Sequence, residues 1–139
     1  RWPGKLNAGT ESSQVGVTMD LTASVVGTLR VPLASDGTRS VSTTTLDGIN
    51  IVEHIREQKA NVPRTLFWRQ RRGDVTWRGV RDGNIKLVSK EDGTQRQDWL
   101  FDLTTDGAEK LDLLAQRPAE AQRISRLLSD WESDVRPTR

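Results

Sequence analysis

Short apolar runs alternate with glycine-containing turns along the middle of the chain, between residues 66 and 103. The turns read RRGD, RDGN and EDGT, and an Asp-Gly pair between half-apolar runs is a strong local signal for a β-hairpin. This pattern predicts an antiparallel meander of four strands. The expected strands are Leu66–Trp68, Thr76–Arg81, Asn84–Ser89 and Asp98–Leu103.

Apolar residues repeat at every second position in these predicted strands. Trp99, Phe101 and Leu103 share one face of the last strand, and Ile85 and Leu87 share one face of the third. Because successive side chains of a strand point to opposite faces, this spacing predicts a sheet with one apolar face. That face needs a covering layer.

The segment that begins at Pro118 carries apolar residues at helical spacing. They are Ile124, Leu127, Leu128, Trp131 and Val135. Such a stripe is typical of an amphipathic helix, and proline suits the first helical turn because its missing N–H would have no partner there. We therefore predict an α+β fold, in which a four-stranded antiparallel sheet is packed by a C-terminal helix.

The first part of the chain contains two shorter helical patterns. Thr18–Leu29 has apolar residues at helical spacing, although its β-branched residues would also suit a strand. Residues 49–55 carry enough apolar positions for one or two helical turns. Between the two patterns, Pro32–Gly48 is rich in serine, threonine and glycine, which predicts an exposed loop.

The composition argues against several kinds of site. The 139 residues include no cysteine, so a disulfide, a thiolate zinc site and a cysteine nucleophile are excluded. The single histidine, His54, has no neighbouring nucleophile signal and is interpreted as a structural residue. No phosphate-binding glycine motif is present, and no apolar run has the length of a membrane span, so we expect no membrane partner.

Charge is nearly balanced, because 21 basic and 19 acidic residues leave a net charge of +2. Arginines nevertheless gather around the first hairpin, close to Trp68 and Trp77. These arginines are Arg64, Arg69, Arg71, Arg72, Arg78 and Arg81. Cations mixed with aromatic rings are typical of single-stranded nucleic acid binding, but arginines also keep the wet face of a sheet soluble. We favour the solvated face, with a stand-alone polyanion- or nucleic-acid-binding module as the alternative.

Two motifs stand out in the second half of the chain. VRDGNIKL, residues 80–87, has the pattern VR-x-G-x-x-K-L, and LFDL, residues 100–103, begins the pattern L-[YF]-D-L-x-x-D-x-x-E that Asp106 and Glu109 complete. RWPGKLNAGTESSQ precedes them and PAEAQRISRLLSDW follows them. In this order the segments closely resemble the C-terminal third of the sulfatase family, which consists of arylsulfatase-like enzymes of the alkaline-phosphatase-like superfamily.

The resemblance implies a fold and a place in a larger protein. Residues 47–139 would form the C-terminal subdomain of an α/β alkaline-phosphatase-like enzyme, with its antiparallel sheet and C-terminal helix. Residues 1–46 would be the trailing segment of the catalytic domain. Asp106 and Glu109 are expected to start a short helix that leads to Leu113.

The chemistry that the resemblance implies lies outside this sequence. Sulfatases hydrolyse sulfate esters with a formylglycine, made in a C/S-x-P-x-R motif, and with a calcium ion held by aspartates and an asparagine. In the family's order these motifs come upstream of Arg1, and none of them matches a residue here. We therefore expect no catalytic residue, metal ligand or cofactor in this chain, whereas the parent protein would use Ca²⁺ and a formylglycine.

The resemblance also suggests partners. The sheet would pack against the missing N-terminal catalytic domain of an exported parent, and its turns would form one wall of the cleft for a sulfate ester. Five cations are candidates for that rim: Arg69, Arg71, Arg72, Lys90 and Arg96. They would attract an anionic substrate, although solvated turns are the simpler interpretation. No nucleic acid partner is expected, and an uncovered apolar face would favour self-association.

Overall fold

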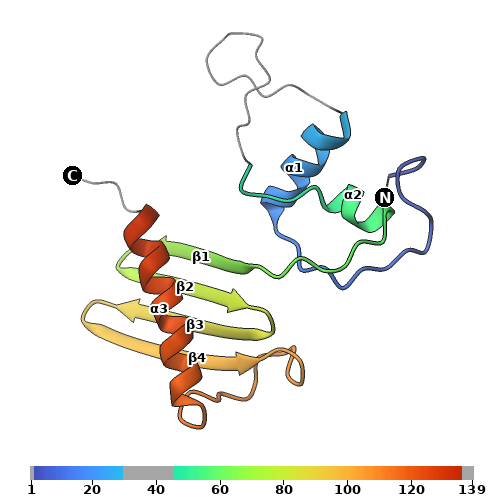
Figure 1. Cartoon of the computed structure of the whole chain (residues 1–139). Coiled ribbons are helices and arrows are strands. Elements are labelled where there is room, and N and C mark those ends of the chain that lie inside the picture. The colour runs from blue at the N-terminus through green and yellow to red at the C-terminus, as the bar shows by residue number, and fades with distance from the viewer. Residues whose placement is uncertain (1, 30–45, 136–139) are drawn as a thin grey trace, which may run out of the picture. The chain divides into compact units, whose positions relative to one another are not determined.

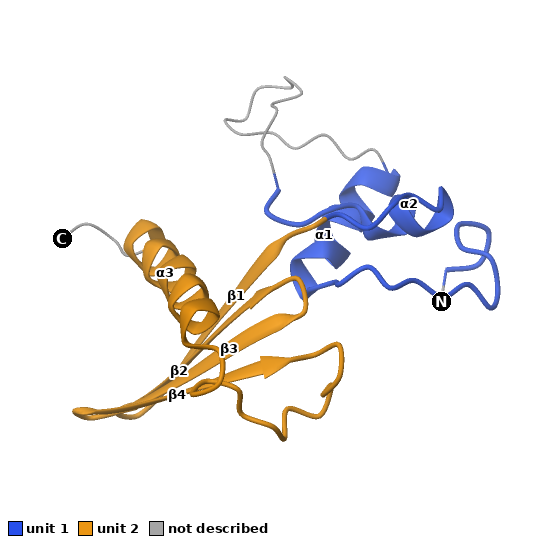
Figure 2. Cartoon of the chain, turned by 60° about the horizontal axis from the view of Figure 1, so that its bottom comes forward, with its two compact units in different colours: residues 1–62 blue, residues 63–139 orange. Residues whose placement is uncertain are grey.

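The computed structural model describes residues 2–29 and 46–135 (Figure 1). The chain folds into two compact units, Arg1–Val62 and Pro63–Arg139, which Figure 2 shows in different colours. Most of the predicted loop at Pro32–Gly48 lies outside the described residues. The assignment of residues 1–46 and 47–139 to different parts of a parent enzyme stays a prediction.

The first unit contains two helices, α1 (Thr18–Leu29) and α2 (Ile51–Arg56), both of which the sequence predicted. The buried carboxylate of Asp20 joins them, because it accepts hydrogen bonds from Val17 N–H (2.7 Å) and Ile49 N–H (2.9 Å). Ser24 Oγ accepts a further hydrogen bond from Ile51 N–H at 2.9 Å. These bonds satisfy backbone donors at the start of each helix and hold α2 in the same compact unit as α1.

The second unit contains a four-stranded antiparallel sheet in the order β1-β2-β3-β4 (Figure 1). Its strands are β1 (Thr65–Arg72), β2 (Val75–Asp82), β3 (Ile85–Asp92) and β4 (Gln95–Asp102). Each turn between them has two residues and begins with a glycine at a φ of about +60°, namely Gly73, Gly83 and Gly93. Glycine takes this conformation without steric cost, so the turns can be this tight.

The meander is confirmed, but its strands are longer than predicted. The polar residues beside each glycine pair in the ladder instead of forming four-residue turns. The residues between the third and fourth predicted strands, 90–97, form the end of β3, a tight turn and the start of β4. The polar side chains at the strand ends are exposed to solvent, but the backbone there still forms the hydrogen bonds of the sheet.

The predicted apolar face of the sheet is wrong for β4. In the observed register Leu100 lies opposite Leu87, and Leu87 lies opposite Val80, so these three side chains share the face that packs on the helix. Trp99 and Phe101 therefore point to the other face. In a continuous apolar run, either set of alternate residues could face the helix. Here the tight turns fix the register, and the register decides which set does.

Helix α3 (Pro118–Val135) covers one face of the sheet, as predicted, and Figure 2 shows it on that side. Ile124 and Leu128 are buried against the strands, and the ring of Trp131 stacks on Phe67 with a centroid distance of 5.0 Å. The α+β fold is thereby confirmed. The short helix expected near Leu113 does not form, because Asp106 Oδ2 accepts hydrogen bonds from two successive backbone N–H groups and closes a turn instead.

Asp82 of β2 links the sheet to α3. Arg123 Nη1 donates to Asp82 Oδ2 at 2.7 Å, and Thr65 Oγ1 donates to Asp82 Oδ1 at 2.9 Å. The bond from Arg123 is the main reason that the pKa of Asp82 lies below its ordinary value of 3.8; burial opposes the shift, and the bond from Thr65 adds to it. The ionised carboxylate is thus favoured in the folded protein.

The variant Asp82→Asn is expected to lose at most about 1 kcal/mol of stability at neutral pH. Because folding lowers the pKa, the contribution of Asp82 is present above pH 3.8 and is lost as the pH falls from there through the lowered folded value. Urea unfolding of both proteins from about pH 7 to about pH 2 measures this. A difference in stability that stayed constant over the whole range would contradict the assignment.

Candidate functional site

The five predicted rim cations lie on two different faces of the sheet. Arg71 pairs with Thr76 across β1 and β2, and Arg96 pairs with Glu91 across β3 and β4, so both belong to rows on the α3 side, as does Arg69. Arg72 and Lys90 alternate to the opposite face. The structure therefore does not bring the five together, and their role at a substrate cleft stays a prediction.

Several of these cations have close partners within the second unit. Arg96 Nε donates to Asp98 Oδ1 at 3.0 Å, and Arg71 Nε donates to the backbone oxygen of Gly73 at 3.1 Å. Lys90 Nζ lies 3.4 Å from a carboxylate oxygen of Asp92. These contacts lower the net positive field that the turns present to solvent.

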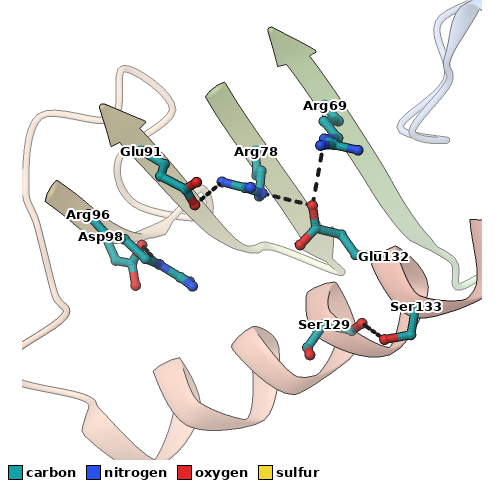
Figure 3. Close-up of polar contacts among 8 residues, drawn as sticks. All are labelled: Arg69, Arg78, Glu91, Arg96, Asp98, Ser129, Glu132 and Ser133. Carbon is teal, nitrogen blue, oxygen red and sulfur yellow. Dashed lines mark hydrogen bonds and ion pairs between the residues drawn. The ribbon is translucent and has the colours of Figure 1, made fainter. Parts of the chain in front are cut away.

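Arg69 and Arg78 belong to an ion-pair network between the sheet and α3 (Figure 3). Arg78 Nε donates to Glu132 Oε1 at 2.7 Å and Arg78 Nη1 donates to Glu91 Oε2 at 3.0 Å, while Arg69 Nε lies 3.7 Å from Glu132. Burial of Arg78 opposes its charge, but the hydrogen bonds and charges of the two glutamates outweigh this and raise its pKa. Two arginines of the cluster noted in the sequence, Arg69 and Arg78, therefore help to hold α3 on the sheet.

The open face of the sheet, opposite α3, carries exposed aromatic side chains. Trp68 and Trp77 are 43% and 41% exposed. The rings of Trp77 and Trp99 stack with their centroids 6.0 Å apart and their planes 13° apart. Lys90 Nζ lies 5.8 Å from the centroid of the Trp77 ring, within reach of a cation–π interaction.

Two hollows flank Trp77 on this open face. The first has a volume of about 300 Å³, and the second has a volume of about 450 Å³. The first is lined by Trp68, Gln70, Trp77, Arg78, Gly79, Lys86 and Val88. The alternation of apolar residues predicts Trp99 on the covered face, but the structure places it beside Trp77 on the open face. Counting outward from the two-residue turns gives this register.

The described residues contain no group of three or more histidine, cysteine, aspartate or glutamate side chains that could hold a metal ion. The calcium site that the sulfatase resemblance implies stays a prediction for another part of the parent protein. His54, in the first unit, is buried, and its Nε2 has no hydrogen-bond partner among the described residues. No described helix is both long enough and apolar enough to cross a membrane.

No family model and no curated protein sequence matches the chain. Solved structures do match it. Ps i-CgsB has a TM-score of 0.73 and 19% identity, over 97% of this chain and 28% of its own. For yidJ of Bacteroides fragilis, a candidate sulfatase, the TM-score is 0.67 and the identity 16%, over 94% of this chain and 27% of its own. The chain has the fold of part of a sulfatase.

A third match agrees with this sulfatase fold. BT33336S-sulf, from the glycosaminoglycan metabolism of Bacteroides thetaiotaomicron, has a TM-score of 0.55 and 20% identity, over 82% of this chain and 24% of its own. The chain thus spans about a quarter of the length of the proteins it matches. This partial coverage agrees with the predicted C-terminal region, and the resemblance read from the sequence motifs is confirmed at the level of the fold.

Proposed function

We propose that this chain is the C-terminal part of a sulfuric ester hydrolase whose catalytic residues lie in another part of the same protein. The observation that carries this proposal is the similarity of 97% of the chain to about a quarter of a much longer protein, Ps i-CgsB, at a TM-score of 0.73. The role of the chain would be to stabilise the catalytic domain and to contribute turns to the wall of the substrate cleft.

An uncovered apolar stripe on α1 supports a missing protein partner. Leu21, Val25 and Leu29 follow one another at four-residue spacing on one side of this helix and are exposed, while Asp20 and Ser24 are buried. Apolar side chains clustered on a helix surface normally mark a protein contact. The catalytic domain is the partner that we propose for this stripe.

The cofactors of the proposed enzyme would be supplied by its catalytic domain. We propose Ca²⁺ and a formylglycine there, because the sulfatase resemblance implies both and no residue of this chain matches their motifs. No step of ester hydrolysis is assigned to residues of this chain.

The substrate class follows from the structural neighbours. Ps i-CgsB has been crystallised with the oligosaccharide k-i-k-neocarrahexaose, and BT33336S-sulf belongs to glycosaminoglycan metabolism. We therefore propose a sulfated polysaccharide as the substrate of the whole enzyme. Of the rim cations, Arg72 lies on the open face and would attract it by long-range electrostatics, whereas the charge of Lys90 is shared with Asp92.

The natural protein that contains this sequence provides the test. We expect its coding sequence to include a C/S-x-P-x-R motif and the purified protein to release inorganic sulfate from sulfated carrageenan or glycosaminoglycan oligosaccharides. Replacement of the motif's cysteine or serine by alanine should abolish release, and residues 1–139 alone should show none.

The alternative function predicts a different result. If the natural protein lacks that motif and releases no sulfate, the chain would be a stand-alone polyanion-binding module. Residues 1–139 would then bind heparin or single-stranded DNA with an affinity that falls steeply as salt increases. This outcome would overturn the sulfatase proposal.

A further inference from the structure

The first hollow on the open face of the sheet has two aromatic walls, and Gly79, which has no side chain, lies between them. Trp68 lies opposite Gly79 in the register of β1 and β2. A Cβ atom built at Gly79 would lie 3.6 Å from the Trp68 ring, so the glycine keeps the floor low without relieving a clash. The half-exposed rings of Trp68 and Trp77 stand on either side. We call this space, of about 300 Å³, the tryptophan hollow.

Polar groups stand beside these apolar walls. Gln70 supplies an amide that both donates and accepts hydrogen bonds, and Lys86 supplies an ammonium group. A concave site with mostly apolar walls and a few polar groups is the usual architecture of a small-ligand site. The ligand therefore needs one flat apolar surface and an edge rich in hydrogen-bonding groups.

Two lysines near the hollow have carboxylate partners. Lys86 Nζ lies 2.6 Å from Glu109 Oε1, and Lys90, beside the Trp77 ring, lies 3.4 Å from Asp92. Each of these two lysines thus has its own carboxylate, while Arg72 and Arg81 also lie on this face of the sheet. Binding of a nucleic acid or another strong polyanion relies on cations that release counterions, and these lysines are already neutralised by the protein.

A pyranose ring meets all three requirements. One face of the sugar ring is a flat array of C–H groups, which carry partial positive charge and suit the negative face of an indole ring. Its edge consists of hydroxyl groups, which pair with an amide, an ammonium group or a carboxylate. We propose that the tryptophan hollow binds a pyranose unit of a neutral glycan chain, stacked on Trp77 and held at its edge by Gln70 and Lys86.

The second hollow extends this site along the glycan. It lies on the other side of Trp77 and is walled by Trp99 and Phe101, with Glu109 and Asp112 at its rim. The rings of Trp77 and Trp99 stack on each other and together form one aromatic wall of this second hollow. Both hollows consist of residues between 63 and 135, and glycan binding there is independent of the activity proposed above.

Titration of residues 1–139 with neutral hexasaccharides tests the proposal. Cellohexaose, agarohexaose and mannohexaose serve as probes, followed by tryptophan fluorescence and by isothermal titration calorimetry. We expect saturable binding of at least one probe, with an affinity that is nearly independent of salt. Trp77→Ala should weaken this binding by about tenfold, the loss expected for one stacking surface.

A second variant fills the hollow and keeps every tryptophan. Gly79→Val suits a strand and should weaken binding at least as much as Trp77→Ala. Gly107→Val is its matched control, because no heavy atom lies within 4 Å of a Cβ atom built at Gly107, and it should leave binding unchanged. Circular dichroism and urea midpoints test whether the variants are folded. If Gly79→Val is not folded, Gly79→Ala replaces it, because a Cβ atom at this position would lie at an ordinary contact distance of 3.6 Å from the Trp68 ring.

Three results would overturn the proposal. The first is the absence of binding to all three neutral probes. The second is binding of heparin hexasaccharide only, with a steep dependence on salt, which would indicate a polyanion surface. The third is self-association that Trp77→Ala abolishes, without glycan binding, which would show that the open face is a contact between proteins.

Discussion

Replacement of Leu100 by alanine is expected to lower the free energy of unfolding of the second unit by about 3 kcal/mol. Leu100 has no exposed surface and lies beside Leu87 of β3 in the core cluster that includes Ile124 and Leu128 of α3. Its backbone oxygen also accepts a hydrogen bond from Leu113 N–H at 2.8 Å, which fixes the surrounding chain and limits collapse into the cavity. A unit of this size has a total stability of only about 4 to 10 kcal/mol, so the loss is large.

Urea unfolding followed by tryptophan fluorescence measures this effect specifically. Four of the five tryptophans, all except Trp2, belong to the second unit, so the signal reports its unfolding. Leu111→Ala is the matched control, because Leu111 is 58% exposed and its truncation should change the stability by less than about 0.5 kcal/mol. Equal effects of the two truncations would contradict the packing of Leu100.

The variant Glu132→Ala is expected to destabilise the second unit by about 2 kcal/mol. Only 8% of the Arg78 side chain and 14% of the Glu132 side chain are exposed, and removal of Glu132 leaves the guanidinium with Glu91 as its remaining ion-pair partner in the network of Figure 3. A buried charge that loses a partner costs more than the pair contributed, because its desolvation is no longer compensated.

Two further variants separate this cost from ordinary packing. Glu91→Ala removes a carboxylate whose side chain is 43% exposed, and should cost less than about 1 kcal/mol. The double variant Arg78→Met with Glu132→Met removes both buried charges and should recover most of the stability that Glu132→Ala loses. The explanation fails if urea unfolding shows the double variant to be less stable than Glu132→Ala.

The sequence allowed the architecture of the second unit to be predicted, because its signals are local. Asp-Gly turns and the stripe from Ile124 to Val135 define the hairpins and the helix without reference to distant residues. The face of β4 was not predicted, since the run WLFDL is apolar on both sides. Only the register set by the turns places Leu100 inward and Trp99 outward.

The candidate site was harder to predict, because charge composition does not reveal pairing. The sequence shows Arg69 and Arg78 beside two tryptophans, but Glu132, which binds both, lies far along the chain in α3. The role of Asp20 could not be predicted for the same reason. It accepts a hydrogen bond from Ile49 N–H, which is distant in sequence, and the local pattern around Asp20 does not reveal that contact. Long-range pairs of this kind become visible only in the fold.

The succession of three two-residue turns has a consequence for the speed of folding. Every strand pairs with its immediate neighbour in sequence, so each step of sheet assembly closes a very short loop and loses little chain entropy. Domains dominated by such local contacts fold faster than sheets that are assembled from distant segments. Formation of the sheet can therefore start at any of its three turns, and α3 can then pack on strands that are already paired.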